Sequence, residues 1–110
     1  MMSQTDLELL ALAAKAAGDV SPLLEVWKGE YAHFEQRGVG WNPLTDDGQA
    51  LRLAAQLRLR VLPGKHPGDG CTVESQQAGI VGCTAFYDDP AKQMRVAVVR
   101  VAAEIGKSMA

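Results

Sequence analysis

The hydrophobic pattern changes its period near Leu57, and this change restricts the chain to folds that combine helices with strands. Before this point, apolar residues recur at three- and four-residue steps, which is the spacing of a helix with one buried face. From Leu57 to Val61, apolar residues alternate with arginines, which predicts a strand with one buried and one exposed face. Neither an all-helical fold nor an all-strand fold accounts for both patterns.

Three helices are predicted around this strand. Ser3 or Thr5 can cap the first helix, with Thr5–Glu8 at the spacing of a capping box, and Gly18 is placed to end it. Thr45 or Asp46 can cap the second helix, because the side chain of either can accept from the first backbone N–H groups. The third follows Asp89, which precedes a proline suited to the first helical position. Together with the strands, these helices predict an α+β fold, in which a small antiparallel sheet of about three strands packs against two or three helices.

A hairpin supplies the other two strands of the predicted sheet. Its arms are residues 71–75 and 80–87, joined by a turn at residues 77–79. This turn places Cys71 and Cys83 on the same face of the sheet. The two cysteines are then either a redox pair or two small apolar side chains that fill the sheet face, and the second alternative is preferred because free cysteine is commonly buried.

The length and charge predict one soluble domain. The chain has 110 residues, of which 47% are hydrophobic, and a net charge of -2, which fits a single domain over residues 1–110. No apolar run is long enough for a bilayer and no signal peptide is evident, so we expect a cytoplasmic protein. Acidic residues outnumber basic ones in residues 1–50, and the reverse holds for 51–110. The two halves either attract each other within the fold or form a polarised partner surface.

Residues 19–44 are predicted to be an irregular segment, except for a short helix near Pro22, because glycines interrupt the pattern and no period persists. Four of the six aromatic residues of the chain lie here, and they are the candidate interaction residues: Trp27, Tyr31, Phe34 and Trp41. Aromatic side chains on such a segment serve either as core or as a contact surface for a partner. Both alternatives are open at this point.

Arginines give a second candidate surface, in the basic half of the chain. The four residues concerned are Arg58, Arg60, Arg95 and Arg100. Gathered on one face, they would suit a nucleic-acid-binding protein. Alternating arginines on a strand also protect a sheet edge from aggregation. This is the preferred interpretation of Arg58 and Arg60.

No catalytic, cofactor-binding or metal-ligating set is predicted. Neither histidine lies in a predicted helix with a second metal ligand three or four residues further on. The aspartate pairs at residues 46–47 and 88–89 directly precede helices, where capping accounts for them. We therefore expect that the protein is not an enzyme. An enzyme or small-ligand binder that uses Cys71, Cys83 or His66 is the least favoured alternative.

Two segments resemble the NinX-like group of short phage and prophage proteins. They are Trp41–Leu53, with the sequence WNPLTDDGQALRL, and Val98–Met109. The resemblance implies a phage or prophage accessory protein in the cytoplasm of the bacterial host, and it transfers no site, because the group has no established activity. Within the first segment, Asn42 and Pro43 predict a turn, with Trp41 packed beside the start of the helix.

These observations favour a non-enzymatic protein-interaction module of phage origin. Its expected partner is a host or phage protein, and a homodimer is a further option. The alternative is a nucleic-acid-associated phage regulator that uses the basic C-terminal half. No membrane partner is expected.

Overall fold

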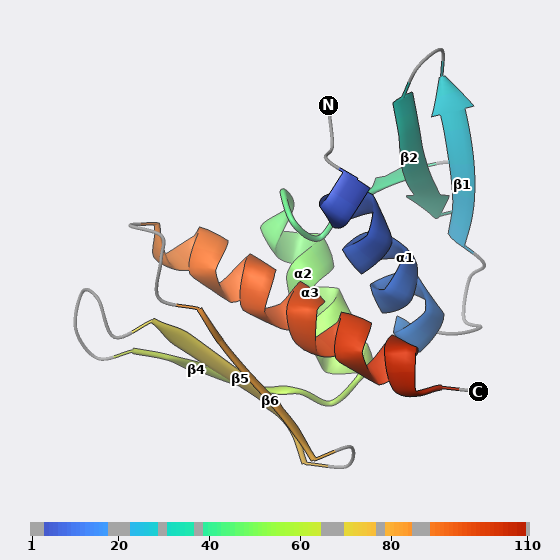
Figure 1. Ribbon diagram of the computed structural model, residues 1–110. Helices are drawn as coiled ribbons and strands as arrows, with labels where there is room; N and C mark the ends of the chain where they lie inside the picture. Colours follow the sequence, from blue (N-terminus) through green and yellow to red (C-terminus); the bar gives the residue numbers. More distant parts are fainter. Residues whose placement is uncertain are drawn as a thin grey trace.

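Figure 1 shows the computed structural model, which describes residues 4–17, 23–28, 31–36, 39–64, 70–76, 79–84 and 89–109. The helices are α1 (Gln4–Ala17), α2 (Asp47–Gln56) and α3 (Pro90–Ser108). The strands are β1 (Leu23–Lys28), β2 (Tyr31–Gln36), β3 (Val39–Trp41), β4 (Arg60–Pro63), β5 (Cys71–Ser75) and β6 (Ile80–Thr84). Strands β4, β5 and β6 form a three-stranded antiparallel sheet in that order, and α3 packs across one of its faces. The predicted α+β class is confirmed.

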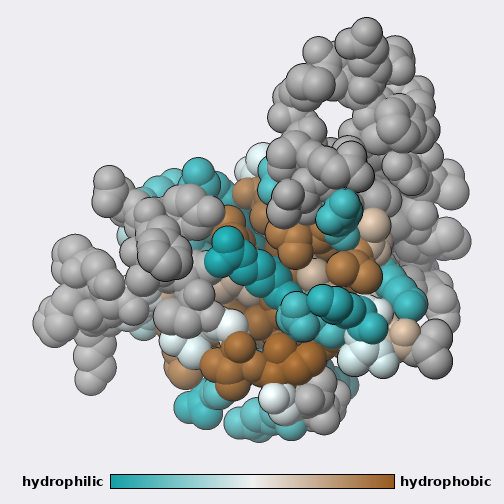
Figure 2. All heavy atoms as spheres, viewed as in Figure 1, coloured by the Kyte–Doolittle hydropathy of each residue, from teal (hydrophilic) through white to brown (hydrophobic). Residues whose placement is uncertain are grey.

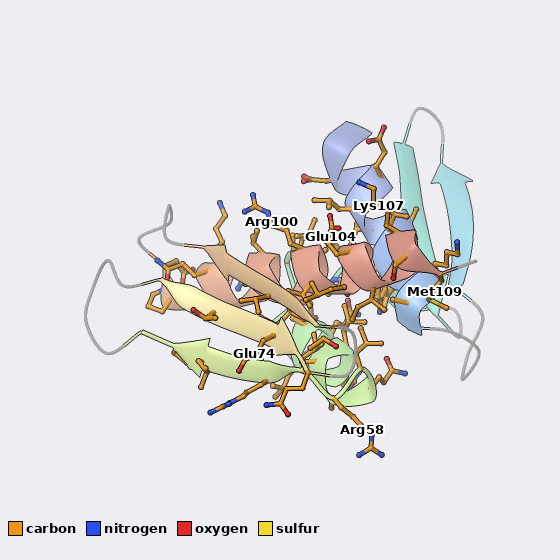
Figure 3. All side chains as sticks on the ribbon, turned by 60° about the horizontal axis from the view of Figure 1, so that its bottom comes forward. Arg58, Glu74, Arg100, Glu104, Lys107 and Met109 are labelled. Atoms are coloured by element: carbon orange, nitrogen blue, oxygen red, sulfur yellow. The ribbon has the colours of Figure 1, made fainter. Side chains whose placement is uncertain are left out.

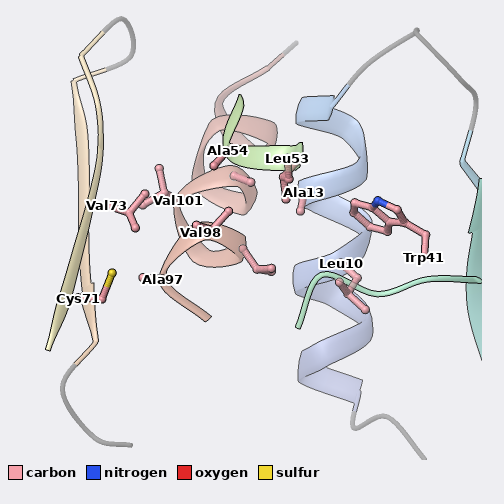
Figure 4. Close-up of a cluster of buried hydrophobic side chains, with 12 residues drawn as sticks. Leu10, Ala13, Trp41, Leu53, Ala54, Cys71, Val73, Ala97, Val98 and Val101 are labelled. Atoms are coloured by element: carbon pink, nitrogen blue, oxygen red, sulfur yellow. The ribbon is translucent and has the colours of Figure 1, made fainter. Parts of the chain in front are cut away.

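Helix α3 lies at the centre of the molecule, between the sheet of β4–β6 and the helices α1 and α2 (Figures 1 and 4). Most of its residues between Val96 and Ala103 are buried, so it is apolar around much of its circumference. A cluster of buried side chains from α1, β3, α2, β5 and α3 forms the core: Leu10, Ala13, Trp41, Leu53, Ala54, Cys71, Val73, Ala97, Val98, Val99, Val101 and Ala102. Most of these side chains are small, which allows the helices and the sheet to approach closely.

The predicted caps of α2 and α3 are confirmed, whereas Thr5, the predicted capping-box residue of the first helix, lies inside α1. Ser3 and Gly18, the other predicted cap residues of that helix, lie outside the described residues. The Gln49 N–H donates to the Asp46 carboxylate at 2.9 Å, and the Ala91 N–H donates to Asp89 at 2.9 Å. The predicted turn before α2 is also present, because the Leu44 N–H donates to the Asn42 side-chain oxygen at 3.0 Å. These short-range signals define where α2 and α3 begin.

Strand β4 begins three residues later than predicted. Leu57 caps the C-terminus of α2, and the Leu59 N–H donates to the carbonyl oxygen of Ala54 at 2.8 Å. Arg58 between them has a φ of 54°, in the left-handed region. The first residues of the alternating pattern therefore end the helix, and only its last part, from Arg60, belongs to the sheet.

The prediction of an irregular segment over residues 19–44 is wrong for most of its length. Strands β1, β2 and β3 form a second antiparallel sheet, with Lys28 opposite Tyr31 and Gln36 opposite Val39. The predicted short helix near Pro22 is also wrong, because Leu23–Lys28 is a strand. Two residues, one of them a glycine, separate each pair of strands in the sequence, and this spacing is typical of hairpins.

The hairpin of β5 and β6 has a register one residue away from the predicted one. Ser75 pairs with Ile80, which places Cys71 opposite Thr84 and Cys83 opposite Thr72. A shift of one residue moves every position of a strand to the other face of the sheet. The two cysteine positions therefore lie on opposite faces, and the prediction that they share a face, on which the redox pair rested, is wrong. Residues 85–87 of the predicted second arm lie outside the described residues.

Candidate interaction surface

The four aromatic candidates all belong to the sheet of β1–β3, with Trp27 in β1, Tyr31 and Phe34 in β2, and Trp41 in β3. Phe34 pairs directly with Trp41. Trp41 is only 7% exposed and packs in the core beside α1, close to Leu10 (Figure 4). Trp41 is therefore a core residue, the first of its two predicted roles, and it forms no part of an exposed contact surface. For the other three the backbone is described but side-chain contacts are not, so their contact role stays a prediction.

Arg95 is structural. Its guanidinium donates to the Leu44 carbonyl oxygen at 2.9 Å and forms an ion pair with Asp47 at 2.5 Å, and its side chain is 15% exposed. Through these bonds, Arg95 of α3 holds the turn at Leu44 and the start of α2 at Asp47 against α3. They also join the acidic half of the chain to the basic half, which supports attraction within one fold as the meaning of the charge asymmetry.

Replacement of Arg95 by alanine is expected to lower the free energy of unfolding by about 1–2 kcal/mol, because a charge-assisted bond to a backbone carbonyl is lost. The ion pair itself adds little, since Asp47 is largely exposed. The matched control is Arg52→Ala at an exposed position of α2, with an expected change within about 0.5 kcal/mol. Urea unfolding measures both. Equal effects of the two substitutions would contradict a structural role for Arg95.

The other three candidate arginines do not lie on a common surface. Arg60 forms an ion pair with Glu74 of the neighbouring strand at 3.3 Å. Arg58 follows α2, whereas Arg100 lies on α3, and Figure 3 shows the two projecting from opposite sides of the molecule. The four arginines therefore do not form one basic surface.

The described residues offer no cluster of three or more histidine, cysteine, aspartate or glutamate side chains that could hold a metal ion. Cys71 is buried against α3 (Figure 4). His66 lies outside the described residues. Within the same residues, no helix is both long enough and apolar enough to cross a membrane.

The two edges of the β4–β6 sheet differ in a way that was not predicted. Edge strand β4 contains Arg60 and Pro63, a charge and a residue without an N–H group, which are the usual means of preventing edge-to-edge pairing. Edge strand β6 has the sequence IVGCT, with no charge and no proline. No described strand lies beyond β6 (Figure 1). The signal was present in the sequence, but it became interpretable only once the strand order was known.

Each edge strand of the β4–β6 sheet exposes one large apolar side chain. Val81 in β6 is 65% exposed, and Leu62 in β4 is 41% exposed. Each lies outward from α3, because Val81 pairs with Glu74 and Leu62 with Thr72, whereas the alternate β5 residues Cys71 and Val73 are buried. Figure 2 shows hydrophobic residues over the β6 side of the sheet and hydrophilic side chains crossing above them. We call Ile80–Thr84, on the side where no described strand pairs with it, the β6 edge.

Comparison with known proteins identifies no relative. No protein-family model matches the chain, and neither the curated proteins nor the solved structures contain a significant match.

Proposed function

We propose that the protein is a non-enzymatic interaction module that binds another protein chain by strand addition at the β6 edge. The observation that carries this proposal is the contrast between the two edges of one sheet, of which β4 is blocked by Arg60 and Pro63 and β6 is not. An open edge presents unpaired N–H and C=O groups to which an extended segment can add as a further strand. The exposed side chain of Val81 adds apolar area beside those groups.

The biological setting proposed is that of a phage or prophage accessory protein acting in the bacterial cytoplasm. This part rests on the resemblance of Trp41–Leu53 to the NinX-like group. The partner is then a host or phage protein or a second copy of the chain.

The alternative function, a nucleic-acid-associated regulator, has less support. It needs the four candidate arginines on one surface, whereas Arg95 is bonded to Leu44 and Asp47, and Arg60 to Glu74. Retention on duplex DNA that weakens steeply as salt rises from about 50 mM would favour this alternative over the protein-binding proposal.

Substitution of Val81 by lysine is expected to abolish partner capture, because a charge on an edge strand opposes the addition of another strand. Leu62→Lys is the matched control, since it makes a similar change on the opposite edge strand of the same sheet. A tagged copy and an untagged copy are expressed together in a bacterial host, and captured proteins are identified by mass spectrometry. The proposal expects a protein that is captured by the wild type and by Leu62→Lys but not by Val81→Lys.

Two results would overturn the proposal. One is that nothing, including the untagged copy, is captured in a Val81-dependent way. The other is that capture depends instead on Trp27, Tyr31 and Phe34 when these are replaced together by alanine in a variant that remains folded, which would transfer the contact role to the sheet of β1–β3.

A further inference from the structure

We infer that the chain which occupies the β6 edge is a second copy of this protein, so that two β4–β6 sheets join into one continuous antiparallel sheet about a two-fold axis at Gly82. This inference rests on the proposed function, because it uses the same edge. Three observations carry it: the sequence of β6, the position of α3 above the edge, and the charges on the exposed side of α3.

Strand β6 is compatible with antiparallel pairing to itself. A two-fold axis at Gly82 places this residue opposite its own equivalent, Val81 opposite position 83 of the second copy, and Ile80 opposite position 84. None of these positions is charged, so no like charges come together. The equivalent self-pairing of β4 would bring Arg60 into the junction and leave Pro63 without a donor.

The position of α3 also fits a second copy. This helix packs mainly over β5 and β6 rather than over β4. Strands in a sheet lie about 4.8 Å apart. A helix centred between β5 and β6 lies about one such spacing from a two-fold axis that runs half a spacing beyond β6. Pairing of two β6 edges would therefore place the two α3 helices about 10 Å apart. Packed helices have interaxial distances of roughly 8–10 Å. The two helices would therefore be in packing contact, adding helix contacts to the strand hydrogen bonds.

Arg100 and Glu104, on the exposed side of α3 near Gly82, carry opposite charges that can pair between two copies of the helix. Gly82 lies against α3 at Val101, whose Cγ2 atom would be 2.8 Å from a Cβ atom placed on the glycine. Arg100 and Glu104 are exposed on either side of that position. Figure 3 shows both projecting on the side of α3 where β6 is the nearest strand. Antiparallel helices related by an axis near residue 102 bring Arg100 of each copy opposite Glu104 of the other.

The first test is the mass of the full-length chain in solution, measured by sedimentation equilibrium over a wide range of concentration. The wild type is expected to form a dimer. Val81→Lys places two lysines close to the two-fold axis and is expected to raise the dimer dissociation constant at least about tenfold, whereas Leu62→Lys leaves it within about threefold. Circular dichroism and thermal unfolding of each variant check that it remains folded.

The second test is a charge exchange that only this symmetric arrangement explains. Arg100→Glu places a glutamate opposite Glu104 and is expected to raise the dissociation constant about tenfold. The double variant, with Glu104→Arg added, restores the opposite charges in both pairs and is expected to recover dimerisation to within about threefold of the wild type. Failure of the double variant to recover would overturn the placement of the axis and with it the inference.

Other outcomes separate this inference from the proposed function. A chain that stays monomeric at every concentration, yet captures a different protein in a Val81-dependent way, overturns the second copy and leaves strand addition in place. A dimer that is insensitive to Val81→Lys, or that is lost equally in Leu62→Lys, overturns the inference, because the copies then meet at another surface. If no chain, neither a second copy nor another protein, is captured in a Val81-dependent way, both the inference and the proposed function are overturned.

Discussion

Replacement of Gly106 by alanine is expected to lower the free energy of unfolding by about 2–3 kcal/mol. Gly106 is buried in α3, where it meets the backbone of α1. A Cβ atom at this position would overlap the carbonyl oxygen of Leu12 and lie 2.8 Å from its carbonyl carbon. A backbone cannot rotate away as a side chain can, so the two helices must move apart, at an overpacking cost of roughly 1–3 kcal/mol or more.

The sign of this effect distinguishes close packing from helix propensity. At an exposed helical site, glycine to alanine stabilises a protein by about 0.5–1 kcal/mol. At Gly106 the overlap outweighs that gain, because the clashing atoms belong to a second helix. The control is Lys107→Ala, one residue further along the same helix and exposed, with an expected change within about 0.5 kcal/mol. Urea unfolding that shows a more stable Gly106→Ala variant would contradict the observed α1–α3 contact.

The second large effect is expected at Trp41. Its removal by Trp41→Ala leaves a cavity between β3 and α1 and is expected to cost about 3–5 kcal/mol. Trp41→Phe keeps an aromatic ring in the same place and should retain part of that stability. Leu51→Ala is the control, because Leu51 is 61% exposed and its loss should change stability by about 0.5 kcal/mol or less.

Trp41→Ala also decides between the two roles considered for this residue. A core residue affects thermal unfolding, whether or not a partner is present. A contact residue would leave the unfolding of the isolated chain unchanged and reduce only partner capture. The second pattern would contradict the burial of Trp41 and return it to the set of interaction candidates.

Local signals in the sequence identified the helices and the α+β class, because each signal acts within one turn of the chain. Asp46 and Asp89 cap the helices that they were predicted to cap, and Asn42 makes the predicted turn. Such contacts span two or three residues, so they need no knowledge of the rest of the fold.

Pairing between strands was harder to predict, because it depends on partners that are distant in the sequence. One residue in the length of the β5–β6 turn decided whether the two cysteine positions share a face. Strand β1 was missed because no clear alternation marks Leu23–Lys28, although Gly29 in the two-residue separator that follows it was a hairpin signal. In both places the tertiary arrangement determined the outcome.

The candidate site was predicted less well than the fold. Arg95 is bonded within the fold and Trp41 is buried, and neither fact follows from residue type. The β6 edge escaped notice because strand order, and not composition, makes Ile80–Thr84 an edge.

Hydrogen–deuterium exchange of the backbone amides tests the central claim, that the β6 edge is covered by a second copy, most directly. Strand pairing slows the exchange of edge amides that otherwise face solvent. We predict that those amides of Ile80–Thr84 that point away from β5 exchange at least about tenfold more slowly above the dimerisation concentration than below it, with Arg60–Leu62 of β4 unchanged. Val81→Lys should remove this dependence on concentration. Exchange in β6 at the same rate at every concentration, or slowing at β4 instead, would contradict the account.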